Sequence, residues 1–259
     1  MDLGLKGRVA LVTGASMGIG EAAVYELAAE GCDLGICARN LEPLNKVRER
    51  VLARGVRCVA VRCDIRKAGE ITAMFDEIKR AFGRLDILVN NAGAATPGAF
   101  ASLSDDQLVA DYELKIMGQV RCTRAALPLL EKSPSPRVIN VNAVAGRVYI
   151  PGLFATTVHR AGCYALNKAL AWELAEKKIL VNSINIGLVH TNQIERMHAQ
   201  RAADVPFEKF MERAAQAVPL KRLGEPHEVS GLIAFLASDR AGFITGASID
   251  VAGGQGVHV

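Results

Sequence analysis

The sequence has no long apolar run, no block of like charges and few aromatic residues, which make up 5% of its 259 residues. No stretch reaches the roughly 18 consecutive apolar residues that suggest a membrane-spanning helix, so we expect no membrane association. The net charge is +4, and the basic residues are scattered or form short pairs such as Lys177-Lys178. This distribution gives no sign of a surface that binds nucleic acid.

Cysteine occurs six times but never in a C-x-x-C pair. Most of the six lie in apolar, strand-like segments, which favours buried, reduced thiols over disulfides or a metal site. Met1 and Asp2 lead almost directly into an apolar segment, without the charged and then apolar pattern of a signal peptide. We therefore expect a cytoplasmic protein without a metal.

Short apolar segments alternate with longer amphipathic ones along the whole sequence. The apolar segments predict strands at 9–13, 34–37, 56–61, 87–89, 138–141, 180–186 and 248–251. The amphipathic segments predict helices at 21–30, 41–53, 71–82, 107–130, 155–177 and 227–237. Alternation of this kind builds a parallel sheet with helices on both faces. The sequence thus predicts an α/β fold, a doubly wound Rossmann-type sheet in a single domain over residues 1–259.

The segment 192–217 departs from this alternation, because it is polar and weakly helical and contains no strand of its own. An insertion of this length in such a fold is more often a lid over a binding site than a spacer. We expect it to cover a substrate.

A glycine-rich turn, Thr13-Gly14-Ala15-Ser16-Met17-Gly18-Ile19-Gly20, joins the first predicted strand to the first predicted helix. Glycines let the backbone approach a pyrophosphate, and a helix N-terminus offers unpaired N–H groups and a partial positive charge. Such a turn alone is a weak signal, but here it lies where a dinucleotide site belongs. We expect cofactor contacts from Gly14, Ser16, Met17, Gly18, Ile19 and Gly20.

The chain resembles the short-chain dehydrogenase/reductase family over nearly its whole length. The glycine-rich turn is similar to the family's phosphate motif, Asn90-Asn91-Ala92-Gly93 to its second motif and Cys63-Asp64-Ile65 to its adenine-binding position. The stretches 219–226 and 244–246 match its C-terminal third. The resemblance implies a homo-oligomer, a dimer or tetramer, with Thr191 at the nicotinamide carboxamide. It also implies cofactor contacts from Asn40, Asp64, Ile65, Asn91, Ala92 and Gly93.

The end of the second predicted strand selects between the two nicotinamide cofactors. An acidic residue there would accept hydrogen bonds from the ribose 2′-hydroxyl and repel a 2′-phosphate. Ala38 occupies that position and Arg39 follows it, and a guanidinium suits a phosphate. We therefore predict NADP(H). The alternative is that Arg39 points into solvent or stacks on adenine, in which case NAD(H) would still bind.

The family's proton chemistry uses a Tyr-x-x-x-Lys pair, and this sequence contains such a motif in Tyr164 and Lys168. In the family, however, the lysine lies ten residues before a Leu-Ala-x-Glu segment, which begins here at Leu170. Counting back puts Arg160 at the lysine position and Thr156 at the tyrosine position. Tyr164 and Lys168 remain the alternative pair, which would require an insertion before them and a deletion after them.

Two further family positions are also substituted. The serine position falls on Ala143, thirteen residues before Thr156, and Lys115 in Leu-Lys-Ile-Met-Gly replaces an asparagine. A lysine buried beside Arg160 would have a lowered pKa, which makes it a useful proton donor near neutral pH. We predict a catalytic set of Lys115, Thr156 and Arg160, with Arg160 also holding the ribose. Other candidate proton donors or substrate contacts are His159, Asn142 and Tyr149.

Two functions are compatible with retained cofactor motifs and substituted catalytic positions. The first is an NADP(H)-dependent oxidoreductase that acts on a carbonyl or hydroxyl group of a small molecule. The second is a non-catalytic NADP(H)-binding protein, either a sensor or a partner subunit. The predicted lid and Thr191 favour the enzyme, because a sensor needs the adenine half of the site more than the nicotinamide half.

Overall fold

A parallel sheet of seven strands, in the order β3-β2-β1-β4-β5-β6-β7, forms the centre of the computed structural model, which describes residues 2–256 apart from the side chain of Arg201. Its strands are β1 Val9–Thr13, β2 Asp33–Ala38, β3 Cys58–Arg62, β4 Ile87–Asn90, β5 Arg137–Ala143, β6 Leu180–Ile186 and β7 Ser248–Val251. The strand order reverses between β1 and β4, and ligands of doubly wound folds bind beyond the carboxyl ends of the strands at such a point.

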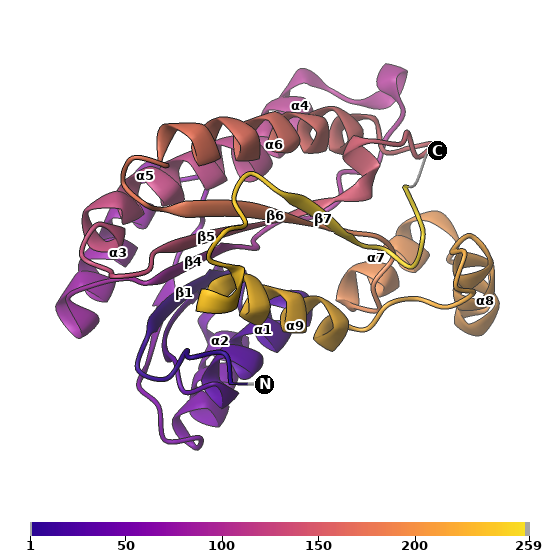
Figure 1. Cartoon of the computed structure of the whole chain (residues 1–259). Helices are drawn as coiled ribbons and strands as arrows, with labels where there is room; N and C mark the ends of the chain where they lie inside the picture. Colours follow the sequence, from indigo (N-terminus) through magenta and orange to yellow (C-terminus); the bar gives the residue numbers. More distant parts are fainter. Residues whose placement is uncertain (1, 257–259) are drawn as a thin grey trace.

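Helices cover both faces of the sheet (Figure 1). One face carries α1 Gly18–Ala29, α2 Leu41–Leu52 and α9 Pro226–Ala237, and the other carries α3 Ala68–Phe82, α5 Gly118–Leu130 and α6 Phe154–Glu173. Alternate residues of β1 enter the two cores, Ala10 and Val12 on the first face and Val9 and Leu11 on the second. Helices cover both faces, so the central strands β1 and β4 are buried throughout and almost continuously apolar, as the sequence pattern indicated.

The predicted helix 107–130 is wrong as a single α-helix. It begins as α4 Asp105–Tyr112, passes through a π-helical turn at Glu113–Met117 and continues as α5. The π-helical turn is closed by the Gly118 N–H, which donates to the Glu113 carbonyl five residues earlier. A side chain at position 118 would collide with Ile65, because a Cβ added to Gly118 would lie 2.6 Å from Ile65 Cδ1.

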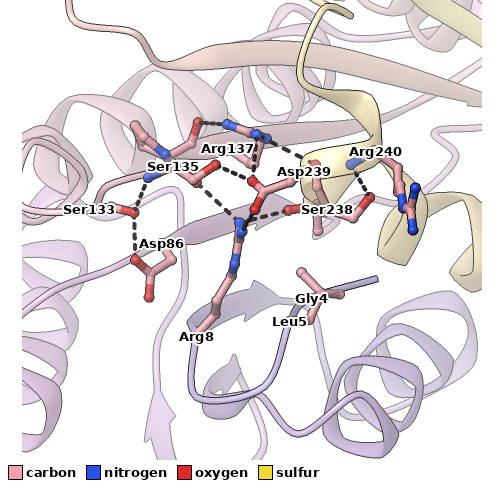
Figure 2. A network of polar contacts seen from close by, with 12 residues as sticks. Gly4, Leu5, Arg8, Asp86, Ser133, Ser135, Arg137, Ser238, Asp239 and Arg240 are labelled. Carbon is pink, nitrogen blue, oxygen red and sulfur yellow. Dashed lines mark hydrogen bonds and ion pairs between the residues drawn. The ribbon is translucent and has the colours of Figure 1, made fainter. Parts of the chain in front are cut away.

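The amino ends of the strands are joined by a polar network around Asp239 (Figure 2). The carboxylate of Asp239 accepts from Arg8 at 2.6 Å, from Ser135 at 2.7 Å and from Arg137 at 3.4 Å. These residues come from the start of β1, the loop before β5 and the start of β5. The network therefore holds together the end of the sheet that lies opposite to the carboxyl ends of the strands.

The segment 192–217 forms two helices, α7 Asn192–Arg201 and α8 Phe207–Gln216, which lie beyond the ends of β6 and β7 (Figure 1). The helices pack together through His198, whose ring lies 5.2 Å from those of Phe207 and Phe210. The expectation of a helical segment without a strand is confirmed.

Three further observations concern the described residues. All six cysteines are free, buried thiols. No described helix has the length and apolar character needed to span a bilayer. In the same part of the chain, no group of three or more His, Cys, Asp or Glu side chains is arranged to hold a metal.

Candidate active site

A cavity of about 620 Å³ lies at the carboxyl ends of the central strands. The turn after β1, the loops after β4, β5 and β6, the first half of α6 and the helix α7 line it. The predicted site residues among its lining are Gly14, Met17, Gly18, Ile19, Gly20, Asn91, Ala92, Gly93, Thr156, Arg160 and Thr191. Its position at the reversal of strand order is the expected place for a dinucleotide.

The two motifs after β1 and β4 form one platform. The side-chain amide of Asn91 donates to the carbonyl oxygens of Thr13 and Gly14 at 2.9 and 3.1 Å, and the Asn91 and Ala92 N–H groups donate to the Thr13 hydroxyl. An added Cβ on Gly20 would lie 2.2 Å from the Gly14 carbonyl oxygen, so the turn requires glycine there. No side chain caps the N-terminus of α1, which leaves its backbone N–H groups available to an anion.

The adenine end of the predicted site lies outside this cavity. Arg39 is exposed beyond the end of β2, followed by Asn40, which is also exposed. Asp64 is fixed by Arg66, whose guanidinium hydrogen bonds lower the pKa of the Asp64 carboxyl to about 2. Ser16, the remaining predicted cofactor contact in the glycine-rich turn, does not line the cavity, whereas its neighbour Met17 does.

Arg160 is buried between β5 and the loop after β4. Its Nη1 donates to the Val141 carbonyl at 2.8 Å, whereas its Nε has no hydrogen-bond partner among the described residues. An added Cβ on Gly93 would lie 2.9 Å from Nη2, so this loop approaches the guanidinium closely. Arg160 thus places a fixed positive charge in the lining of the cavity.

Lys115 is completely buried and does not itself line the cavity. Its Nζ donates to Asp111 Oδ1 at 2.5 Å and to Thr156 Oγ1 at 3.0 Å. Thr156 therefore connects the buried ammonium group to the lining of the cavity. Burial, followed by repulsion from Arg160, lowers the pKa of Lys115 to about 8, although Asp111 opposes the shift. These are the two causes that the sequence suggested, and the structure brings the three predicted catalytic residues together.

Two residues of this cluster were not among the sequence candidates. Asp111 is fully buried, and its carboxylate accepts hydrogen bonds from Lys115, from the Thr96 hydroxyl at 2.5 Å and from His159 Nδ1 at 2.7 Å. Burial raises the pKa of Asp111, but these three donors together lower it below its usual value. The spacing of four residues between Asp111 and Lys115 on one helix could have identified Asp111, whereas nothing in the sequence pointed to Thr96.

The alternative pair, Tyr164 and Lys168, contacts the backbone rather than the cavity. The Tyr164 hydroxyl donates to the Ala143 carbonyl at 3.2 Å, and Lys168 Nζ donates to the Gly246 carbonyl at 2.8 Å. Burial raises the pKa of Tyr164 to about 12. Of the other candidates, Asn142 is buried and donates to the Arg160 carbonyl, and Tyr149 is 60% exposed.

The helix α7 forms one wall of the cavity. Thr191 accepts a hydrogen bond from the Gln193 N–H at the start of α7, and its methyl group would lie 3.3 Å from a Cβ added to Gly18. The charged side chains among the described lining residues are Arg160 and Arg196, and no acidic side chain is present there. The apolar side chains of the lining include Pro97, Val148, Ile150, Leu153 and Met197.

Comparisons with known proteins agree with this architecture. Residues 14–256 match the family model described as enoyl-(acyl carrier protein) reductase. The oxidoreductase UcpA of Salmonella typhimurium is 37% identical, with 97% of this chain and 95% of the relative covered. A 3-oxoacyl-[acyl-carrier-protein] reductase of Synechocystis sp. is 34% identical, with 97% and 98% covered.

Solved structures are similar over the same length. L-sorbose reductase from Gluconobacter frateurii, complexed with NADPH and L-sorbose, has a TM-score of 0.94 at 28% identity, with both chains covered completely. An NADPH-bound short-chain oxidoreductase from Pseudomonas aeruginosa, described as containing an atypical catalytic center, has a TM-score of 0.90 at 35% identity, with 97% of this chain and 98% of that one covered. Fold, motifs and relatives agree, and the chain belongs to the short-chain dehydrogenase/reductase family of oxidoreductases.

Proposed function

We propose that this oxidoreductase uses NADP(H) to interconvert a carbonyl and a hydroxyl group of a small molecule, with Thr156, Lys115 and Arg160 as its catalytic residues. The observation that carries the proposal is the position of Thr156, which lines the cavity and accepts a hydrogen bond from a buried ammonium group. A proton donor and its supply are thus aligned at the place where the nicotinamide of a bound cofactor belongs.

The hydrogen bonds of Thr156 define its role. Its oxygen accepts from Lys115 Nζ and from the Thr96 N–H at 3.1 Å. An ammonium group and a backbone N–H can only donate, so the threonine's own proton is left for a partner in the cavity. Thr156 gives that proton to the substrate oxygen during reduction, and Lys115 returns one to Thr156. The bound NADPH supplies the hydride.

The residues of the cavity fit a dinucleotide phosphate. The uncapped N-terminus of α1 and the glycines of the turn suit the pyrophosphate, and the positive charge of Arg160 in the cavity lining suits a ribose or nicotinamide oxygen. The exposed guanidinium of Arg39 suits the 2′-phosphate. Asn40, Asp64 and Ile65 are proposed to hold the adenosine, and Thr191 the carboxamide. Two relatives of known structure bind NADPH.

The same lining indicates the character of the substrate. Apolar side chains share the cavity lining with Thr156, so a substrate with an apolar body would fit there. The segment 192–217 is proposed to act as the lid over this body. We place the enzyme in the cytoplasm, where six free thiols stay reduced, and expect the dimer or tetramer that is usual in the family.

The test is an absorbance assay of NADPH oxidation over a broad panel of carbonyl compounds. We expect turnover by the natural chain and a loss of roughly 10²-fold or more in Lys115→Met, the usual effect of losing a general acid, with NADPH affinity nearly unchanged. Tight NADPH binding without turnover on any compound would contradict the proposal. That result would favour a non-catalytic NADP(H)-binding protein, which Ala143 makes the second candidate because it supplies no hydroxyl for the substrate oxygen.

A further inference from the structure

Four side chains form a continuous path from the cavity toward the surface. Thr156 lines the cavity, Lys115 contacts Thr156, Asp111 contacts Lys115, and His159 Nδ1 lies 2.7 Å from Asp111 Oδ2. The side chains of Lys115 and Asp111 have no exposed surface, whereas that of His159 is 14% exposed. His159 is therefore the titratable member of the path through which water can be reached.

The path includes more groups than the Lys115–Thr156 pair needs. A lysine paired with one carboxylate would already be held in place, yet the second oxygen of Asp111 is used for an imidazole. Thr96 fixes the path from the side, because its N–H donates to Thr156 and its hydroxyl donates to Asp111. The ring of His159 is kept in place edge-on against Tyr112, with 5.8 Å between ring centroids.

The charges around Lys115 come from two elements, α4 and α6. Asp111 on α4 is negative, Arg160 on α6 is positive, and His159 on α6 changes its charge with its proton; the Cys163 thiol on α6 also faces the lysine. When Lys115 gives up its proton, the negative charge of Asp111 remains in a buried position. A positive charge arriving from the surface side would compensate it, and the imidazole in contact with Asp111 is placed to supply that charge.

We propose that His159 and Asp111 are positioning residues that restore the proton of Lys115 from solvent, so that Thr156, Lys115, Asp111 and His159 act as one proton relay. The inference rests on the proposed function of the cavity. It assigns a role to His159 beyond that of the direct proton donor considered from the sequence, because His159 contacts Asp111 and does not line the cavity.

The proton balance of one reduction is as follows. The carbonyl carbon receives a hydride from NADPH, and its oxygen receives the hydroxyl proton of Thr156. Lys115 Nζ gives a proton to Thr156 Oγ1 and becomes a neutral amine. His159 in its imidazolium form gives its Nδ1 proton to Asp111 Oδ2 and becomes neutral, and the carboxyl group, once it has turned about its Cβ–Cγ bond, gives this proton to Nζ. His159 recovers its proton from water, and the sum is one hydride and one proton added to the carbonyl.

The first experiment replaces the outer member of the relay. We expect His159→Ala to lower kcat on the order of tenfold, less than the loss of a general acid, because Thr156 and Lys115 remain. Added imidazole should restore most of the rate, since it can enter the space next to Asp111 that the ring has left. His227→Ala, at an exposed histidine on α9, is the matched control and should respond neither to the substitution nor to imidazole.

The second experiment replaces the inner carboxylate. Asp111→Asn keeps a hydrogen-bonding side chain but removes the charge that opposes the lowering of the Lys115 pKa. The loss of reductase activity on raising pH should then begin at a lower pH than in the natural chain. Asp106→Asn, at an exposed aspartate of the same helix, should leave the pH profile unchanged.

The outcomes separate the relay from the function on which it rests. Absence of turnover in the natural chain would overturn both. Turnover that is lost in Lys115→Met but unchanged in His159→Ala at every pH and every imidazole concentration would overturn the relay alone. A fall in kcat that imidazole does not restore, with an unshifted pH profile in Asp111→Asn, would assign these residues a purely structural role and would also overturn the relay.

Discussion

The ammonium group of Lys115 donates a 3.0 Å hydrogen bond to the hydroxyl of Thr156, which lies 41 residues further along the chain. The two residues come from the π-helical turn before α5 and from the first turn of α6. Neither residue alone would be an effective proton donor, because a threonine is a weak acid and this lysine does not reach the cavity. The proposed function depends on the pair, because Thr156 lines the cavity and Lys115 contacts its hydroxyl.

Reductase activity should fall as pH rises through about 8. Lys115 must be protonated to return a proton to Thr156, and its pKa lies near that value because of burial and the charge of Arg160. Below this pH the donor is charged and active, and above it the amine is neutral and cannot donate. The profile is measured as steady-state rates of NADPH oxidation between pH 6 and 10, which covers about two units on either side of this pKa. An unchanged rate up to pH 10 would contradict the role of Lys115.

Oxidation of the corresponding alcohol should show the opposite dependence. In that direction Lys115 must begin as a neutral amine, so the rate should increase through the same pKa of about 8. The measurement follows NADP⁺ reduction with the product alcohol of the first active carbonyl compound. If the two directions declined together at high pH, unfolding or cofactor loss would be the cause rather than proton supply.

Tyr164→Phe should leave kcat and NADPH affinity nearly unchanged. The hydroxyl of Tyr164 contacts the Ala143 carbonyl and does not face the cavity, so its removal takes away one hydrogen bond worth about 1 kcal/mol of stability. Steady-state kinetics and thermal unfolding are the measurements. A decrease in kcat of roughly 10²-fold would instead restore Tyr164 and Lys168 as the catalytic pair.

NADPH should bind more tightly than NADH, and Arg39→Ala should remove most of that preference. The guanidinium is exposed beyond β2, where it can pair with a 2′-phosphate, and Ala38 offers no carboxylate to a 2′-hydroxyl. Fluorescence titration with both cofactors gives the ratio. Arg80→Ala on α3, another exposed arginine, serves as the control. Equal affinities in the natural chain would contradict the assignment to NADP(H).

Lys115→Met should destabilise the fold by about 3–5 kcal/mol, because it leaves the carboxylate of Asp111 buried without its charged partner. Adding Asp111→Leu should recover much of this loss, since an apolar pair can replace a buried ion pair at little cost. Chemical denaturation of the two single variants and the double variant completes the cycle. A double variant no more stable than Lys115→Met would show that Asp111 is needed for the fold through Thr96 and His159.

The fold could be predicted because its strands are buried on both faces. The predicted strand 9–13 coincides with β1 and the predicted strand 87–89 with all but the last residue of β4, and both strands are buried along their whole length. Helix ends were less accurate. The helix predicted at 21–30 begins at Gly18. Glycine is unfavourable in the interior of a helix, which is why the prediction left the glycines out, but it is tolerated in an uncapped first turn that faces a ligand site.

The site was predictable only in part. Spacing within one helix placed Thr156 and Arg160 together, and the structure confirms that both line one cavity. The partnership of Asp111 with His159, 48 residues apart, depends on how α4 packs against α6 and has no counterpart in local sequence. The burial of Lys115 behind Thr156 depends on the same packing.

The position of Asp111 relative to His159 depends on the number of residues in the π-helical turn at Glu113–Met117. Removing a single residue there would allow a regular α-helix and would rotate the preceding helix by about 100° relative to α5. Asp111 would then point away from His159, although every side chain of the cluster was still present. A one-codon insertion or deletion is therefore enough to assemble or dismantle such a centre, and related chains with identical polar residues but a different length in this turn are expected to differ in chemistry.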